Sequence, residues 1–542
     1  MNKLSFFHKG DSRGMGFSYE NNRLSEISFF AFLILVGFFL AALVLKLFQL
    51  TIVKGQYYLN LSEGNRIREF LIEPKRGEIL DRKGYTIVKN LDPDIESDIN
   101  QIKKDNNRIV SKRIYETPEA VAPLIGYRQL ADKNDLKLDN CLYKLKSGDK
   151  VGKKGVEKIF DCTLKGQPGK KLIETDAQGN FLRTLTVIPP TNGQNIQLSI
   201  DWELQKKAFE LLEGKRGAIV ATVPKTGEIL ALASSPSFSP QDFENGNNIN
   251  INKYFKDKDQ PLFNRTTEAT YPPGSIFKLM TATAALEEKA IDEQTQVEDK
   301  GILTAGSLTF GNWYYLQYGK TDGMVDIIKA IKRSNDIFFY TIGEKTGVDA
   351  VKKWSELFGL GRKTNIGLEE TEGIIPSTFW KEQTLKDRWY TGDTYNFSIG
   401  QGYIGVTPLQ IAVMTSAITN NGSICQPKLL KGEAPNCHKL PVSQKTLDLL
   451  HEGMRQACST GGTGWPLFDF KTKKGPIQTA CKTGTAESHA KSGLPHAWIA
   501  AYAPDKNPEI NLTIIVEEGG QGSDVAGPIA KELFTTYFDR SQ

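Results

Sequence analysis

The longest run of apolar positions in the chain lies near its N-terminus. Residues Ile27 to Leu45 carry no charged side chain and are rich in Phe, Leu, Val and Ala. A helix of this length can cross the hydrocarbon core of a bilayer. A signal sequence has a shorter apolar core that ends in small residues, whereas this run continues into Lys46-Leu47-Phe48. The pattern therefore predicts an uncleaved transmembrane helix over residues 27–45, rather than a signal peptide or a buried core helix.

Downstream of residue 195, apolar and alternating runs predict strands at both ends of a long segment. Ala218–Val223 and Glu228–Ala233 predict a hairpin, joined by the turn Pro224-Lys225-Thr226-Gly227. Because strands from the two ends enclose helices, we expect an α+β domain whose ends close one antiparallel sheet. The predicted strands are residues 196–200, 218–223, 228–233, 478–482, 498–503 and 510–516, and the predicted helices are 201–213, 275–290 and 525–537.

The composition is that of a globular protein, with 39% hydrophobic and 24% charged residues among 542. This length suits two or three domains. The formal net charge of +5 is small for the size, which argues against a nucleic acid as the main partner.

Charges before the apolar run predict its orientation. Under the positive-inside rule, the more basic flank stays in the cytoplasm. We therefore expect residues 1–26 to form a cytoplasmic tail and the chain after Lys46 to lie outside the cytoplasm. The basic residues Lys3, Lys9, Arg13 and Arg23 outnumber the acidic Asp11, Glu20 and Glu26.

The cysteines give little support to a metal site, because none forms a CxxC pair and the chain has only 5 histidines. Cys425 and Cys437 flank a loop that contains Pro and Gly. A disulfide between them outside the cytoplasm and two free thiols are both compatible with the pattern. The other cysteines are Cys141, Cys162, Cys458 and Cys481.

Candidate chemistry begins at Ser275 and Lys278, which follow Pro272-Pro273-Gly274 at a predicted helix start. Residues three apart share a helix face, so the lysine can reach the serine hydroxyl. Serine is a weak nucleophile unless a base lies beside it, and a helix N-terminus favours developing negative charge. The same Ser-x-x-Lys spacing recurs at Ser147/Lys150 and Ser488/Lys491, but neither pair opens an apolar-periodic helix.

Two later motifs add candidate partners for this pair. Ser334 and Asp336 place a hydroxyl and a carboxylate two residues apart, which alone is also typical of a helix-capping signal. Lys482-Thr483-Gly484-Thr485 leads out of a predicted strand. Its lysine and threonine can bind a substrate carboxylate, and glycine lets a backbone approach closely. Lys-Thr-Gly also occurs at 225–227 and 345–347, in a predicted turn and at a predicted helix end.

Ser-x-x-Lys, Ser-x-Asp and Lys-Thr-Gly, in this order, resemble the motif set of the penicillin-recognising serine enzymes. Flanking segments from about residue 50 to 540 are similar to class B penicillin-binding proteins. Ser334–Tyr340 and His496-Ala497-Trp498 are more similar to the elongation-type members than to the septal ones. The other matching segments are Asn65-Arg66, Pro74–Gly84, Gly155–Glu157, Gly166–Gly169, Pro224–Ala231, Ser235-Pro236, Asn264-Arg265, Tyr271–Lys278, Gly373–Pro376, Ser398–Gly402, Thr407–Gln410 and Lys482–Ala486.

This resemblance implies a penicillin-binding transpeptidase fold over residues 196–542, in which helices flank a five-stranded antiparallel sheet. It implies an extended membrane-proximal pedestal of the dimerisation type over residues 46–195. The implied substrates are peptidoglycan stem peptides that end in D-Ala-D-Ala, and the implied inhibitors are β-lactams. The implied partner is a polytopic glycosyltransferase of the SEDS family in the bacterial inner membrane. No cofactor is expected.

The resemblance also implies roles for the motif residues. Lys278 would take the proton of Ser275, which would form an acyl-enzyme, and Ser334 would relay the proton to the leaving D-Ala. The backbone N–H groups of Ser275 and Thr485 would form the oxyanion hole. The implied carboxylate-binding residues are Lys482, Thr483 and Thr485, with Gly484 beside them.

Two positions depart from the pattern of the class. Asp336 stands where the middle motif usually ends in Asn. Because an ionised carboxylate accepts hydrogen bonds but donates none, we expect Asp336 to hold Lys278 or Lys482. Some relatives carry zinc near the active site on a His and a Cys, whereas the equivalent positions here are Lys320 and Asn335. We therefore expect no metal.

Other functions remain compatible with these motifs. A D,D-carboxypeptidase or β-lactamase would use the same acyl-enzyme with water as the acceptor, although the anchor and pedestal count against it. A non-catalytic, penicillin-sensing scaffold would keep the fold and engage a membrane partner. A second, glycosyltransferase domain is disfavoured, because residues 46–200 are rather short for it and resemble the pedestal instead.

Overall fold

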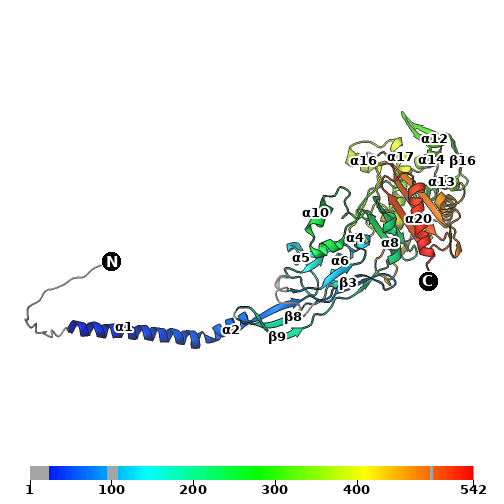
Figure 1. The fold of residues 1–542 in the computed structure, drawn as a ribbon. Coiled ribbons are helices and arrows are strands. Elements are labelled where there is room, and N and C mark those ends of the chain that lie inside the picture. The colour runs from blue at the N-terminus through cyan, green and yellow to red at the C-terminus, as the bar shows by residue number, and fades with distance from the viewer. Residues whose placement is uncertain (1–22, 94–107, 177, 489–491, 541–542) are drawn as a thin grey trace, which may run out of the picture. The chain divides into compact units, whose positions relative to one another are not determined.

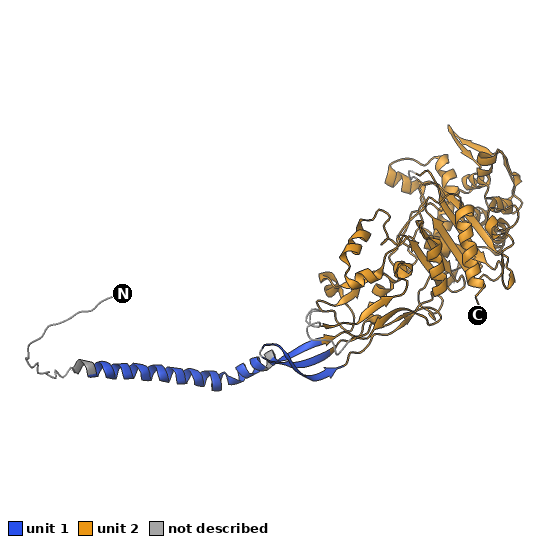
Figure 2. Ribbon diagram, in the orientation of Figure 1, with its two compact units in different colours: residues 1–70, 170–188 blue, residues 71–169, 189–542 orange. Residues whose placement is uncertain are grey.

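The computed structural model describes residues 23–93, 108–176, 178–488 and 492–540. The chain divides into two compact units (Figure 2): residues 1–70 with 170–188, and residues 71–169 with 189–542. Of the tail predicted for residues 1–26, the part before Arg23 lies outside the described residues. Ser488/Lys491, one of the alternative Ser-x-x-Lys pairs, also lies partly outside them.

The first unit begins with the apolar helix α1, Arg23–Phe48, which continues as a π-helical turn over Gln49–Val53. Residues Glu26–Val53 are long and apolar enough to cross a membrane, and none of this stretch is buried by the rest of the protein. The predicted helix at 27–45 is confirmed, and it extends beyond both predicted ends. A short helix and strands complete the unit: α2 (Gly55–Arg66), most of β1 (Ile67–Ile72), most of β8 (Gly169–Thr175), and β9 (Phe181–Ile188).

The second unit starts with a small sheet and a buried ion network. Glu157 is fully buried and pairs with the guanidinium groups of Arg76 and Arg113. Burial opposes the charge of Glu157, but these two cations outweigh it and hold its pKa at about 2. The sheet has the order β10-β2-β3-β5, from strands Ile196–Gln197, Ile79–Leu80, Thr86–Leu91 and Lys112–Tyr115. The strand predicted at 196–200 is thus shorter than expected.

The centre of the second unit is a five-stranded sheet with the order β12-β11-β23-β22-β21. Each neighbouring pair is antiparallel, so the predicted α+β fold with its five-stranded antiparallel sheet is confirmed. The strands are β11 (Gly217–Thr222), β12 (Ile229–Ser235), β21 (Ala480–Ala486), β22 (His496–Ala503) and β23 (Ile510–Val516). The prediction that the strand ends at Lys482 is wrong, because pairing with β22 continues to Ala486.

Helices cover both faces of this sheet (Figure 1). On one face, α8 (Trp202–Leu211) and α20 (Gly522–Phe538) share a core with apolar strand residues such as Ile219 and Ile514. Asp201 caps α8 by accepting a hydrogen bond from the backbone N–H of Leu204. The other face carries α11 (Lys278–Glu287), α13 (Ile327–Arg333), α14 (Asp336–Thr346) and α19 (Gln444–Ala457).

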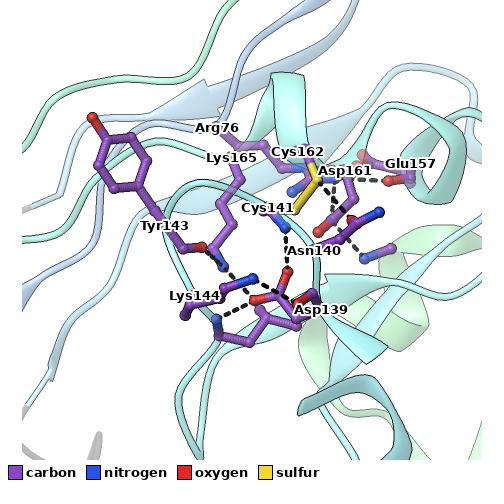
Figure 3. The surroundings of a disulfide bond; sticks show 12 residues. Arg76, Asp139, Asn140, Cys141, Tyr143, Lys144, Glu157, Asp161, Cys162 and Lys165 are labelled. Atoms are coloured by element: carbon purple, nitrogen blue, oxygen red, sulfur yellow. Dashed lines mark hydrogen bonds and ion pairs between the residues drawn. A yellow bond between two sulfur atoms is a disulfide. The ribbon is translucent and has the colours of Figure 1, made fainter. Parts of the chain in front are cut away.

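All six cysteines form disulfides. Cys425 and Cys437 are joined, which decides between the two alternatives that the sequence left open. Cys141–Cys162 (Figure 3) lies beside Lys165 and Asp161 and was not foreseen. Cys458–Cys481 was not foreseen either, and it ties the end of α19 to the residue before Lys482.

Removal of the Cys458–Cys481 bridge is expected to lower the free energy of unfolding by about 3 kcal/mol. The bridge closes a loop between residues 23 positions apart, so its loss frees a long segment of the unfolded chain. Denaturant unfolding of the Cys458→Ala/Cys481→Ala variant in detergent measures the change. Cys425→Ala/Cys437→Ala, whose cysteines are only 12 positions apart, is the matched control and should lose less. Equal stability of the wild type and the Cys458→Ala/Cys481→Ala variant would contradict the prediction.

Candidate active site

Ser275 lies in a short 3₁₀ turn, Gly274–Ile276, and not in an α-helix. The α-helix α11 begins at Lys278, so the predicted start at Ser275 is corrected by one turn. In a 3₁₀ turn residues three apart lie almost above one another, which keeps Ser275 and Lys278 on the same side. Ser275 is half-buried and Lys278 is fully buried.

The amine of Lys278 is surrounded by acceptors from the junction between α13 and α14, where Asp336 is the first residue of α14. Its Nζ donates to Asp336 Oδ1 at 2.6 Å, to the carbonyl oxygen of Ser334 at 2.8 Å and to Ser334 Oγ at 3.2 Å. An ammonium group has three protons, and these contacts use all of them. Between Lys278 Nζ and Ser275 Oγ, both in the described part of the chain, no hydrogen bond is formed.

Ser334 joins the first and third motifs. Its backbone is left-handed, with φ of 55°, where α13 ends. Its Oγ accepts from Lys278 Nζ and also from Lys482 Nζ, the latter at 2.8 Å. A hydroxyl with two such acceptor contacts still has its own proton to donate. The structure therefore brings together the three side chains that the motifs separate by up to 204 positions (482 − 278).

The two lysines have different electrostatic surroundings. Burial lowers the pKa of Lys278, while the Asp336 carboxylate beside it acts in the opposite direction. Burial also lowers the pKa of Lys482, well below its ordinary value, and the nearby charge of Lys278 adds to this shift. One carboxylate thus faces two buried amines.

Asp336 holds Lys278, one of the two lysines that we expected it to hold. Its second carboxylate oxygen accepts from the backbone N–H of Trp313 at 2.9 Å. Its own backbone N–H donates to Asn312 Oδ1. These contacts fix the carboxylate on the lysine, and the sequence pattern gave no signal for Trp313 or Asn312.

The Lys482-Thr483-Gly484-Thr485 motif lies inside the edge strand β21. Thr483 Oγ1 donates to Thr463 Oγ1 at 2.7 Å, and Thr485 Oγ1 donates to Gln521 Oε1 at 3.0 Å. A Cβ atom on Gly484 would lie 3.1 Å from the carbonyl oxygen of Pro273, so this glycine makes room for the turn that carries Ser275. Close approach of a substrate backbone at Gly484 stays a prediction.

Gly274 brings the Ser275 turn close to β21. Its φ is 55°, and a Cβ atom there would lie 2.8 Å from the carbonyl oxygen of Thr485. Glycine alone fits this left-handed, tightly packed position. The turn that carries Ser275 therefore packs against the backbone of Thr485. An oxyanion hole formed by the N–H groups of Ser275 and Thr485 stays a prediction.

The other matches to the Ser-x-x-Lys and Lys-Thr-Gly patterns within the described residues lie in turns, at a strand start or at a helix end. Ser147 and Lys150 lie at a turn and at the start of strand β7, Lys150–Gly152. Lys225 lies in the hairpin turn, and Lys345 lies in the last turn of α14, before Gly347.

Asn335, one of the two residues from which we expect no metal, is a hydrogen-bonded amide. Asn335 Nδ2 donates to Asp299 Oδ2 at 2.8 Å and to Asp322 Oδ2 at 3.0 Å, and Asn335 Oδ1 caps α14. In the described residues, the one group with metal-ligand spacing is Asp139, Cys141 and Cys162. The sulfurs of its two cysteines are joined in a disulfide. The expectation of no metal stays a prediction.

Family models match two parts of the chain. The penicillin-binding protein dimerisation domain matches residues 93–198, and the penicillin binding protein transpeptidase domain matches residues 217–535. Peptidoglycan D,D-transpeptidase MrdA of Haemophilus influenzae is 30% identical, over 96% of this chain and 92% of the relative. The chain belongs to the penicillin-binding protein transpeptidases. The family that the motifs predicted is thereby confirmed.

Solved structures of this family agree with the fold. Pseudomonas aeruginosa PBP2, solved in complex with WCK 5153, is 31% identical with a TM-score of 0.72, over 88% of this chain and 97% of that one. A chain of a peptidoglycan synthase complex, described by its coordination of polymerization and crosslinking, is 28% identical with a TM-score of 0.74, over 95% and 99%. The predicted resemblance to penicillin-binding protein 2 is confirmed. Together with α1, these relatives identify a membrane-anchored member of the family.

Proposed function

We propose that this protein cross-links peptidoglycan stem peptides as a serine D,D-transpeptidase, with Ser275 as the nucleophile. The observation that carries the proposal is the hydrogen-bonded chain Lys278–Ser334–Lys482 beside Ser275. It supplies a base, a proton relay and a cation around one half-buried hydroxyl. The substrate is assigned from the family and from the positive, hydroxyl-lined edge of β21.

In the first step, neutral Lys278 accepts the proton of Ser275 as Oγ attacks the carbonyl carbon of the penultimate D-Ala. Loss of one ammonium proton frees the lone pair that this step needs. The backbone N–H groups of Ser275 and Thr485 stabilise the oxyanion. The peptide C–N bond breaks, and the proton reaches the leaving D-Ala amine through Ser334.

In the second step, the amine of a neighbouring stem peptide attacks the acyl-enzyme. A new amide bond forms, the Ser275 Oγ–C bond breaks, and the proton of the amine returns through Ser334 and Lys278 to Ser275. Lys482, Thr483 and Thr485 hold the terminal carboxylate of the donor peptide before acylation. Because Asp336 pairs with Lys278, its proposed role is to hold the base in position.

A product analysis separates this function from its rivals. With a D-alanyl thioester and a D-amino acid as acceptor, we expect mass spectrometry to show a new amide between the acyl group and the acceptor. Hydrolysis without aminolysis would instead identify a D,D-carboxypeptidase or a β-lactamase. No Ser275 adduct and no product would identify a penicillin-sensing scaffold. A reaction without acceptor is the control for hydrolysis.

The anchor and the family support a location at the bacterial inner membrane, with residues 1–26 in the cytoplasm and the catalytic part outside. We take residues 46–195 as the pedestal and 196–542 as the transpeptidase part, and both boundaries stay predictions. The similar chain in a peptidoglycan synthase complex supports a polytopic SEDS-family glycosyltransferase as the membrane partner. Disulfides in the described residues are compatible with an extracytoplasmic location.

A further inference from the structure

A glycine-rich loop between α19 and the strand β21 contributes a hydroxyl to the edge of the active site. The loop covers residues 458–464, with the sequence Cys-Ser-Thr-Gly-Gly-Thr-Gly. Thr463 is half-buried, so its side chain still reaches solvent. Its Oγ1 lies 2.7 Å from Oγ1 of Thr483 in the Lys-Thr-Gly motif. None of the three motifs includes this residue.

The direction of this hydrogen bond decides which hydroxyl can serve a ligand. A threonine hydroxyl has one proton to donate. Thr483 donates its proton to Thr463, so the proton of Thr463 is the one that remains available. A carboxylate only accepts hydrogen bonds, and it therefore needs a donor in this position. Hydrogen bonds in a chain also polarise one another, which makes Thr463 a stronger donor.

The loop is held on both sides of the hydroxyl. Successive side chains of a strand alternate between its faces, so Cys481 and Thr483 lie on the same face of β21. The disulfide from Cys481 fixes the first loop residue, Cys458, on this face. On the side of the Ser334-x-Asp336 motif, Arg333 Nη1 donates to the carbonyl oxygen of the loop residue Gly461 at 3.1 Å.

Close packing explains the glycines around Thr463. A Cβ atom on Gly462 would lie 2.2 Å from the carbonyl oxygen of Ala457, and one on Gly464 would lie 2.3 Å from Cys481 Sγ. Such contacts cannot be accommodated without movement of backbone or disulfide. The backbone N–H of Gly464 also donates to Ala457 O at 2.8 Å. Thr463 is therefore presented by a rigid loop, which lowers the entropy cost of binding.

We propose that Thr463 is a substrate-specificity residue, whose hydroxyl binds the terminal carboxylate of the donor peptide together with Lys482. This inference rests on the proposed transpeptidase function and adds a residue from outside its motifs. In this arrangement Thr483 acts through Thr463, by orienting the Thr463 hydroxyl toward the carboxylate. Loss of the Thr463 hydroxyl should lower kcat/KM only for substrates that carry the negatively charged terminal carboxylate.

The test compares two thioesters with the full-length protein in detergent. One is a D-alanyl thioester of thioglycolate, which has a free terminal carboxylate, and the other is its methyl ester. Thr463→Val keeps the shape and removes the hydroxyl, and we expect it to lower kcat/KM for the charged substrate by about 10-fold to 100-fold. For the methyl ester we expect a change of less than about 2-fold, and Thr463→Ser should retain most of the activity on both substrates.

Several outcomes would overturn the inference. Equal losses on the two thioesters would show that Thr463 only supports the fold, and no loss on the charged thioester would show that it does not bind the carboxylate. Thr463→Ala is the second variant if Thr463→Val does not fold, with the same expected difference between substrates. Failure of the proposed function is distinguishable, because the wild type would then form no Ser275-dependent product from either thioester.

Discussion

Replacement of Ser275 by alanine is expected to abolish the covalent adduct with labelled penicillin. The acylation rate should fall by at least roughly 10³-fold, because no other group can form the ester in the first step. Ser275 is half-buried in a turn of three residues, and alanine is smaller and fits the same backbone. The melting temperature should therefore stay close to that of the wild type. In-gel fluorescence and the mass of the intact protein measure the adduct.

Ser147 offers a matched control for this experiment. It has the same Ser-x-x-Lys spacing to Lys150 but lies exposed at a turn, so Ser147→Ala should acylate at the wild-type rate. If Ser275→Ala still forms an adduct of the expected mass, another residue is the nucleophile and the assignment of Ser275 is wrong. Peptide mapping of that adduct would identify the residue.

The strands of the central sheet were predictable because both of their faces are buried, which requires nearly continuous runs of apolar residues. Ala218–Val223 and Ile510–Val516 are nearly continuous apolar runs, and the structure buries both in the middle of the sheet. The end of β21 was not predictable from such a pattern. Thr483, Gly484 and Thr485 have no apolar periodicity, and their strand conformation comes from pairing with β22.

The same limit applies to the site. Ser275, Lys278 and Lys482 stood out because their motifs have a chemical meaning at fixed spacing. Trp313 acts through its backbone N–H, which every residue except proline possesses, so its side chain gives no signal. Thr463 acts through a contact with a residue 20 positions away, and no local pattern encodes such a pair. Six cysteines allow about 15 pairings, and the sequence suggested one of the three disulfides, Cys425–Cys437, as an alternative.

Replacement of Asp336 by alanine is expected to lower the free energy of unfolding by about 3–5 kcal/mol. Lys278 is fully buried, and Asp336 is its one carboxylate partner among the described residues. Without it, the ammonium must stay buried unpaired or lose its proton, and both cost free energy. The backbone N–H of Trp313 also loses its acceptor. Denaturant unfolding at neutral pH measures the loss.

The pH dependence of this loss has a definite sign. Burial already lowers the pKa of Lys278 in the folded protein, and the charge of Asp336 opposes that shift. In folded Asp336→Ala the pKa of Lys278 falls further. The loss of stability is therefore complete at pH values below the folded-state pKa of Lys278 in the variant. It shrinks as the pH rises from the folded-state pKa of the variant to that of the wild type, because Lys278 then loses its proton in the wild type too and no longer gains from the charge of Asp336. A loss that is independent of pH would contradict a role through Lys278.

Asp336→Asn is the matched variant that separates charge from shape. The amide keeps an oxygen toward Lys278 Nζ but removes the negative charge that favours the ammonium. Neutral Lys278, which is the proposed base, should therefore prevail at lower pH than in the wild type. The acidic limb of kcat/KM for acylation should move to lower pH, as stopped-flow measurements with a thioester would show. An unmoved limb would mean that another group, with Lys482 as the first candidate, controls the proton of Ser275.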